Sequence, residues 1–456
     1  MVLLGTGRSP RRRPGTALRR AVPVLGAAGA QFSQAAGSFV VSVLSLRQTD
    51  VHVFATLSLA LGALVVVTSI STGLIGDPLT VLDRHDPATR TALRRLLLVV
   101  LVAVSVLGAV APVAGGLLGV GEGLMFGLLV AVWVLEDVLR RLLIAGLHFW
   151  RVVAVDLTHL VVVVGILEVA ATLSARPPGV TRFFLALIVG QLAALALAVG
   201  ILPGPERYLG PAVAGRVGAV LRYGASRAVQ GLLRPGVLLL LRVVVLAVCG
   251  TRALAVLEVG RIVTAPALLL VAGGGSYLLS RHAARARTGG TEGRRDADRA
   301  ALLLAVAAFA VMSVVSVAVL AVPRILGGTP VGRTGSETLV PLLAAWGGYV
   351  LSVAVAMPYT SLGAVLVPQA RLLRARVADA AAQVAGGLVL LAVAPTSWLL
   401  LPLLLGAVSL TMTWTVLRSL LGSPGPGPGP GSGAGSATER GTSGKEARGE
   451  PGVGLP

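Results

Sequence analysis

The chain consists largely of uninterrupted apolar runs, each about as long as a helix that crosses a membrane. A helix needs about 20 apolar residues to span a hydrocarbon core about 30 Å thick. Twelve such runs occur, at residues 22–46, 53–75, 96–118, 124–147, 152–173, 183–202, 224–249, 253–279, 300–322, 339–366, 377–394 and 398–417. Lipid offers no water to backbone polar groups, so continuous runs of this kind must be helical. The sequence therefore predicts an all-α integral membrane protein with about twelve transmembrane helices.

The composition agrees with a protein that resides in lipid. Hydrophobic residues make up 55% of the chain and charged residues only 13%, whereas about a quarter of a soluble domain is charged. The formal net charge of +20 would suggest nucleic acid as a partner of a soluble protein. In a membrane protein the excess Arg is expected in cytoplasmic loops, so we expect no nucleic-acid partner.

The distribution of basic residues predicts the orientation. If the N-terminus lies inside, inside segments hold 27 of the 39 Lys and Arg residues and outside loops hold six. Short loops rich in Arg stay in the cytoplasm. We therefore predict a multi-pass protein of the cytoplasmic membrane with both termini in the cytoplasm.

The twelve runs divide after the sixth, where a long connection separates two similar halves. Both halves begin with a tight hairpin whose second helix runs to a glycine-rich end, near Gly73 and Gly273. Parallel repeats of six helices are typical of alternating-access transporters, with a site between the halves. The expected organisation is a cytoplasmic Arg-rich tail at 1–21, a six-helix bundle at 22–202, a cytoplasmic linker at 203–223, a second six-helix bundle at 224–421 and a disordered Pro/Gly-rich cytoplasmic tail at 422–456.

Charged residues inside the runs are the candidate functional residues, because charge is costly within a membrane. Arg227, Arg234 and Arg242 fall within an arc of about 80° on one helix, at about 100° per residue. Lipid exposure of all three would cost roughly 8–10 kcal/mol, so the stripe is expected to face an aqueous cavity. Arg234 is nearest the midplane, and guanidinium groups suit phosphate oxygens. We predict a substrate site for an anionic ligand. Gln31 and Gln34 are expected either to line the same cavity or to bridge helices by hydrogen bonds.

Other charges within the runs have two interpretations. Arg227 lies near a helix end and can snorkel to the surface, and Arg242 lies at the depth of Glu258, which favours a structural ion pair as much as a ligand contact. In the fourth run, acid precedes base by four residues twice, an arrangement that favours ion pairs on one helix. A proton or cation relay is the alternative. The residues concerned are Glu136, Asp137, Arg140, Arg141, Asp156, Glu258 and Arg261.

No motif for catalysis or a cofactor emerges. Cys249 is the only cysteine, so neither a disulfide framework nor a thiolate cluster is possible. The five histidines lack the spacing of metal ligands, and the glycine-rich stretches lack the Lys-Ser/Thr of a P-loop. We therefore expect a protein that is not an enzyme, with no cofactor and no metal.

Three stretches carry a family resemblance: QFSQAAGSF at residues 31–39, GDPL at 76–79, and EDVLRR at 136–141 leading to Asp156. With the helix layout, they make the chain resemble the polysaccharide flippase branch of the multidrug/oligosaccharidyl-lipid/polysaccharide exporter superfamily, in particular actinobacterial members similar to O-antigen and lipid II flippases. The resemblance implies a V-shaped pair of bundles with a central cavity. It also implies that the protein flips a lipid-linked saccharide outward by alternating access. The saccharide would be a polysaccharide unit or cell-envelope precursor linked to an anionic pyrophosphate lipid carrier. The implied partners are membrane lipid and glycosyltransferases of the same pathway, for a monomeric transporter.

Three other functions are compatible with a polytopic membrane protein. A cation-coupled multidrug antiporter of the same fold would need accessible acids in its cavity. A polymerase or ligase of polysaccharides would need a large outside loop, and no predicted loop is long enough. A scaffold that transports nothing would recruit envelope partners through its tails.

Overall fold

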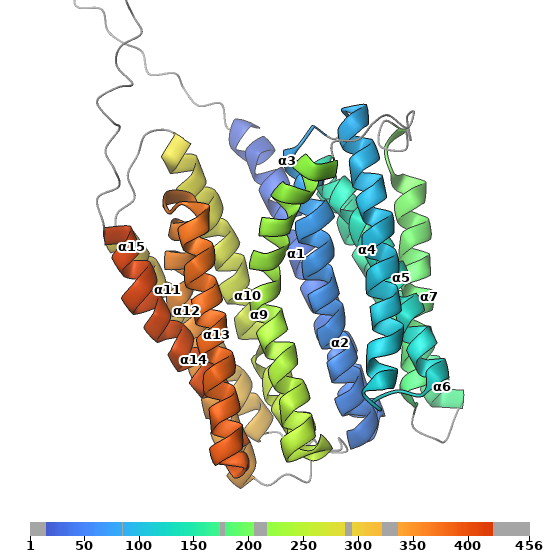
Figure 1. Cartoon of the computed structure of the whole chain (residues 1–456), viewed down its shortest axis with the longest axis vertical. Coiled ribbons are helices and arrows are strands. Elements are labelled where there is room, and N and C mark those ends of the chain that lie inside the picture. The colour runs from blue at the N-terminus through green and yellow to red at the C-terminus, as the bar shows by residue number, and fades with distance from the viewer. Residues whose placement is uncertain are drawn as a thin grey trace, which may run out of the picture.

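The structure, a computed structural model, describes residues 15–83, 85–173, 178–204, 217–287, 294–321 and 336–422. These residues form helices packed side by side, and this part of the chain contains no strand (Figure 1). The predicted tail at 422–456 falls outside the described residues beyond Gly422, as does the N-terminal tail before Gly15. The elements of the first half are α1 (Gly15–Gln48), α2 (Val51–Ser71), η1 (Thr72–Gly76), α3 (Asp77–Val81), α4 (Pro87–Ala114), α5 (Val120–Ala145), α6 (Phe149–Leu173) and α7 (Val180–Ile201). Those of the second half are α9 (Val217–Cys249), α10 (Thr251–Arg287), α11 (Arg294–Ala321), α12 (Ser336–Leu366), α13 (Gln369–Val393), η3 (Pro395–Leu400), α14 (Leu401–Met412), η4 (Thr413–Leu417) and α15 (Arg418–Gly422).

Ten helical segments of the described chain are long and apolar enough to cross a membrane. The predicted runs 22–46 and 124–147 correspond to α1 and α5, which are not among these ten segments. The Gln and Ser residues of α1 lower its hydropathy, and α5 carries four charged residues between positions 136 and 141. Both are nevertheless long helices within the first half, where α1 packs on α6 and α5 packs on α4 and α7. The prediction of an all-helical membrane fold is confirmed.

Local chemistry sets the ends of several helices. Asp50 caps α2 by accepting a hydrogen bond from Val53 N at 2.8 Å, and Asp86 caps α4 with Pro87 at the first helical position. Such caps satisfy N–H groups that have no partner within the helix. Gly250, with φ +84, forms the tight turn between α9 and α10, a conformation that a side chain with a Cβ rarely adopts.

Each half has its own hydrophobic core, and the halves meet closely at one end. In the first half, residues such as Leu129 and Phe184 are fully buried. The core of the second half includes Leu254 of α10, and Phe54 from the start of α2 packs into that same cluster. The halves are therefore joined by apolar contacts at the end where α2 and α10 begin.

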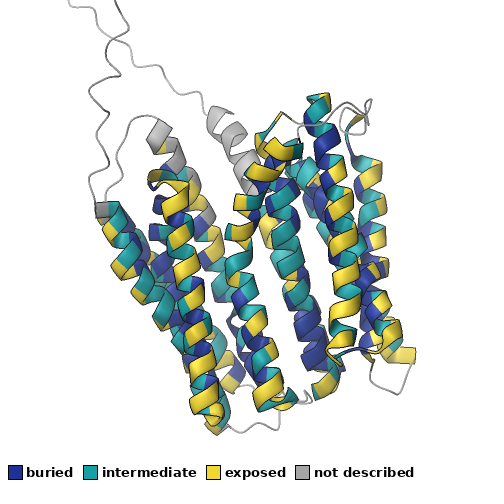
Figure 2. Ribbon diagram, in the orientation of Figure 1, coloured by how far each residue is buried: buried dark blue, intermediate teal, exposed yellow. Residues whose placement is uncertain are grey.

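The exposure of α10 changes along its length (Figure 2). Residues 253–260 are all buried, so this segment is covered on every side. Further along, Ala272, Gly273 and Tyr277 are exposed. The cover over α10 is thus complete where the halves meet and partial toward the opposite end.

A second contact between the halves brings the start of α9 against η1. A Cβ on Gly73 would overlap the backbone of Ala228, and a Cβ on Gly224 would lie 2.9 Å from Leu74 O. The Arg227 guanidinium pairs with Asp77 at 3.0 Å beside this contact. A short π-helical segment such as η1 is rare and occurs mostly within longer helices. Here it supplies the glycine surface on which α9 rests.

We expect Gly73→Ala to destabilise the protein, because the added methyl group has no space against Ala228. Overpacking of a close contact typically costs about 1–3 kcal/mol. The melting temperature in detergent, followed by size-exclusion chromatography of heated samples, should fall by several degrees. Gly165→Ala is the matched control, since a Cβ there would meet no atom within 4 Å. Equal melting temperatures for the two variants would contradict the contact.

Candidate functional site

Arg234 lies in the first half of α9 and is held by a neutral partner. Its Nε and Nη2 donate hydrogen bonds to Tyr349 Oη at 3.1 and 2.9 Å, and its Cζ lies 5.4 Å from the centre of the Tyr349 ring. Tyr349, on α12, is buried, whereas Arg234 is exposed. Among the described residues no carboxylate pairs with Arg234. The contact therefore fixes the guanidinium without neutralising its charge.

The face of α9 that carries Arg234 is open in its first half and covered in its second. Arg227, Gly231 and Arg234 follow helical spacing and are exposed. The same spacing continues to Leu241 and Val245, both of which are buried. The predicted stripe is thus accessible at Arg227 and Arg234, although Arg227 also forms the ion pair with Asp77.

Arg242 occupies an enclosed ionic cluster. Its Nε lies 2.8 Å from Glu258 Oε1, and Arg261 Nε lies 2.6 Å from Glu258 Oε2. Glu258 is 0% exposed and Arg242 is 9% exposed. Removal of one partner from such a buried group leaves an uncompensated charge. Two guanidinium groups share one carboxylate, so the cluster carries one net positive charge.

The surroundings of Arg242 leave no room for a substrate. The cavity beside it measures about 20 Å³ and is lined in part by Trp346 and Tyr349, close to the space of a single water molecule. Its guanidinium also packs on α2, where a Cβ at Gly62 would lie 2.7 Å from Nη1. Arg242 was expected either to contact a ligand or to form a structural ion pair. In this conformation its geometry favours the ion pair with Glu258.

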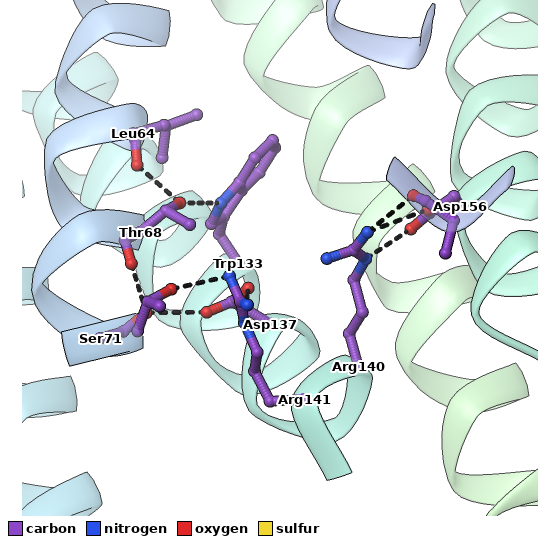
Figure 3. Close-up of polar contacts among 10 residues, drawn as sticks. Leu64, Thr68, Ser71, Trp133, Asp137, Arg140, Arg141 and Asp156 are labelled. Atoms are coloured by element: carbon purple, nitrogen blue, oxygen red, sulfur yellow. Dashed lines mark hydrogen bonds and ion pairs between the residues drawn. The ribbon is translucent and has the colours of Figure 1, made fainter. Parts of the chain in front are cut away.

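In the first half, Arg140 and Asp156 form a buried pair between α5 and α6 (Figure 3). Arg140 Nε lies 3.0 Å from Asp156 Oδ1, and its Nη2 donates to Ala30 O of α1 at 3.0 Å. Ser33 Oγ donates to Asp156 Oδ2 at 2.6 Å. The cluster therefore ties together α1, α5 and α6.

A separate cluster lies on the α2 side of α5 (Figure 3). Asp137 pairs with Arg141 at 3.5 Å and accepts a hydrogen bond from Ser71 Oγ at 2.9 Å. Arg141 Nη2 donates to Thr72 Oγ1 of η1 at 2.9 Å. The spacing of four residues predicted this pair.

The second pair predicted from that spacing, between Glu136 and Arg140, does not form, because Arg140 turns instead toward Asp156 on α6. Glu136 is buried, and the described residues offer it neither a hydrogen bond nor an ion pair. A tertiary partner thus displaces the local one.

The predicted glutamines lie on α1, where Gln31 is exposed and Gln34 is partly buried. Neither side chain hydrogen-bonds to Arg234 in the described part of the chain. Two partner residues were not predicted from the sequence: Tyr349, which holds Arg234, and Asp77, which pairs with Arg227. A tyrosine inside an apolar run was the available signal for the first, because a buried hydroxyl needs a partner. The described residues contain no group of three His, Cys, Asp or Glu side chains suited to a metal ion.

No protein-family model matches the chain, and no curated protein matches it. Several solved structures, in contrast, are similar to it in fold. A multidrug resistance MATE family transporter of the MOP superfamily, in an inward-facing conformation, superposes with TM-score 0.64 and 14% identity over 84% of this chain and 93% of that chain. An outward-facing conformation of such a transporter superposes with TM-score 0.60 and 12% identity, over 89% of this chain and 97% of that chain. A MOP superfamily transporter from Pyrococcus furiosus, described as having a binding pocket of reverse polarity, superposes with TM-score 0.59 and 11% identity, over 89% of this chain and 96% of that chain.

These similarities define the class of fold. The chain has the fold of MOP-superfamily membrane transporters over most of its length. At 11–14% identity the likeness establishes the fold alone.

We expect Glu258→Gln to destabilise the protein strongly, because Arg242 and Arg261 would lose the one carboxylate they share. Breaking a buried ion pair by removing one partner costs about 3–5 kcal/mol. Adding Arg242→Met in the same chain should recover part of the lost melting temperature, since one buried charge is then removed. If the double variant were no more stable than Glu258→Gln, the shared-carboxylate interpretation would be wrong.

Proposed function

We propose that this protein is a membrane transporter that flips or exports a saccharide linked to an anionic lipid carrier, by alternating access between its two halves. Arg234 is the residue that binds the phosphate oxygens of the carrier. The observation that carries the proposal is an exposed guanidinium inside a membrane helix, fixed by a neutral tyrosine and paired with no described carboxylate.

The chemistry of Arg234 fits a phosphorylated cargo. A charge within a membrane is costly and marks substrate pathways, and this one is not neutralised by the protein. The planar guanidinium binds phosphate through two parallel hydrogen bonds. Tyr349 Oη accepts from Nε and from one N–H of Nη2, which leaves the N–H groups of Nη1 and the second N–H of Nη2 to donate to an anion.

The arrangement of the halves supports alternating access. Apolar contacts join them where α2 and α10 begin, and toward the opposite end α10 is exposed at Ala272, Gly273 and Tyr277. The Arg234 face of α9 is likewise open in its first half. On the orientation predicted from the basic residues, the open end is cytoplasmic. A cargo made in the cytoplasm, by glycosyltransferases of the same pathway, would enter there and reach a monomeric transporter in the cytoplasmic membrane.

A cation-coupled multidrug antiporter is the second candidate. Two observations favour it: the MATE family structures that share the fold, and the buried, unpaired Glu136. A cationic drug would, however, meet the uncompensated charge of Arg234, which repels it. The anionic cargo fits the accessible residues better.

We expect Arg234→Ala to lower flipping of a fluorescent lipid-linked saccharide in reconstituted vesicles by roughly tenfold or more, since a charged hydrogen bond contributes about 1.5–3 kcal/mol. Arg234→Lys should retain part of the rate, because it keeps the charge and loses the planar fork. Tyr349→Phe should cost less than Arg234→Ala, because the positive charge remains.

Arg252→Ala is the matched control, an exposed arginine in the turn at the opposite end of α9. Full flipping by Arg234→Ala, in vesicles that contain as much folded protein as the wild type, would refute the site. Drug efflux that depends on Glu136, with no flipping by the wild type, would favour the antiporter. A phenotype that depends only on the tails would favour a scaffold.

A further inference from the structure

An apolar groove runs along the outside of the second half between α9 and α13, the two helices at the front of Figure 1. It encloses about 550 Å³, within the range of sites that bind small molecules. Its walls include Leu233, Gly236 and Leu240 from α9 and Val377, Ala381 and Val384 from α13. Every residue of the lining is apolar, so the groove suits a hydrocarbon chain.

Contacts behind the groove hold its two walls together. Gln230 Nε2, near the middle of α9, donates at 3.4 Å to Gln369 Oε1 at the first residue of α13. Farther along, Leu241 packs so closely on Gly387 that a Cβ there would lie 2.7 Å from it. Contacts therefore advance along both helices together, so α9 and α13 run in the same direction away from one membrane surface, and the start of α9 extends beyond that of α13.

Both walls continue into an arginine toward that surface. On α13, Arg374, Val377, Ala381, Val384 and Leu388 follow helical spacing on one face, which places Arg374 about 4.5 Å above the apolar lining. On α9 the same face runs upward from Leu240 through Gly236, Leu233 and Val229 to Arg222, which lies about 16 Å beyond Leu233 and is therefore much farther from the lining. Both arginines are exposed, and neither forms an ion pair with a described residue.

The groove is separate from the candidate substrate site. Arg234 lies about 160° around α9 from Gly236 and about 60° from Val237, at the margin of the lining, and its guanidinium is held by Tyr349. Tyr349, the partner of Arg234, does not line the groove. A molecule in the groove would thus not occupy the substrate site.

We propose that the α9–α13 groove binds one chain of an anionic phospholipid of the surrounding leaflet, with its phosphate held by Arg374, the arginine next to the apolar lining. A basic site at the membrane surface, above a spanning apolar groove, matches such a lipid in both charge and polarity. The surrounding bilayer supplies this phospholipid without any transport step, so its binding does not depend on which cargo the protein carries. Its binding joins α9, which carries Arg234, to α13.

Native mass spectrometry of the full-length protein, titrated with phosphatidylglycerol and with phosphatidylcholine, tests the site. An arginine near an anionic lipid contributes roughly fivefold in affinity, so the wild type should prefer phosphatidylglycerol by roughly fivefold. Arg374→Gln should lose most of that preference, and Arg252→Gln should keep it.

Filling the groove tests the position of the chain. Ala381→Phe should lower binding of both lipids, and Gly236→Leu, which fills the groove from the other wall, is the second variant should the first fail to fold. Val389→Phe, at an exposed position of α13 outside the groove, should bind as the wild type does. Equal binding of the two phospholipids, or unchanged binding by both filled variants, would overturn the proposal. So would displacement of phosphatidylglycerol by polyprenyl phosphate at equal concentration, which would make the groove part of the cargo site.

Discussion

The absence of water in the hydrocarbon core is the constraint on which this structure depends. It forces the backbone into helices, and it forces each charge within a helix to find a partner inside the protein. The two charged clusters on α5 and the buried Glu258 with its two arginines satisfy that demand. Each cluster also joins helices, so the need for a partner is met by tertiary packing.

Arg234 is the informative departure from this pattern. Its partner is a phenol, which accepts hydrogen bonds and leaves the positive charge in place. The neighbouring Arg242, on the same helix, pairs with the carboxylate of Glu258 and is enclosed. Two residues of one predicted stripe thus have different chemistry, and only the accessible one is suited to bind an anion.

The halves of the molecule are held by two kinds of contact. Apolar side chains such as Phe54 and Leu254 pack together at one end, whereas backbone approach at Gly73 and the Arg227–Asp77 pair join α9 to η1. An exposed ion pair contributes little net free energy, while apolar packing contributes more per contact area. The contact at η1 would therefore separate at a lower cost in free energy than the apolar contact.

The sequence by itself determined the helical membrane fold, because run length and unbroken hydrophobicity permit nothing else in lipid. It also predicted local pairs, as Asp137 and Arg141 show. Only the tertiary structure decided that Arg140 turns from Glu136 to Asp156, that Arg242 is enclosed, and that Tyr349 holds Arg234. Those outcomes depend on which helix faces contact each other across the bundle. The periodicity of one helical segment does not determine which other segment its faces will contact.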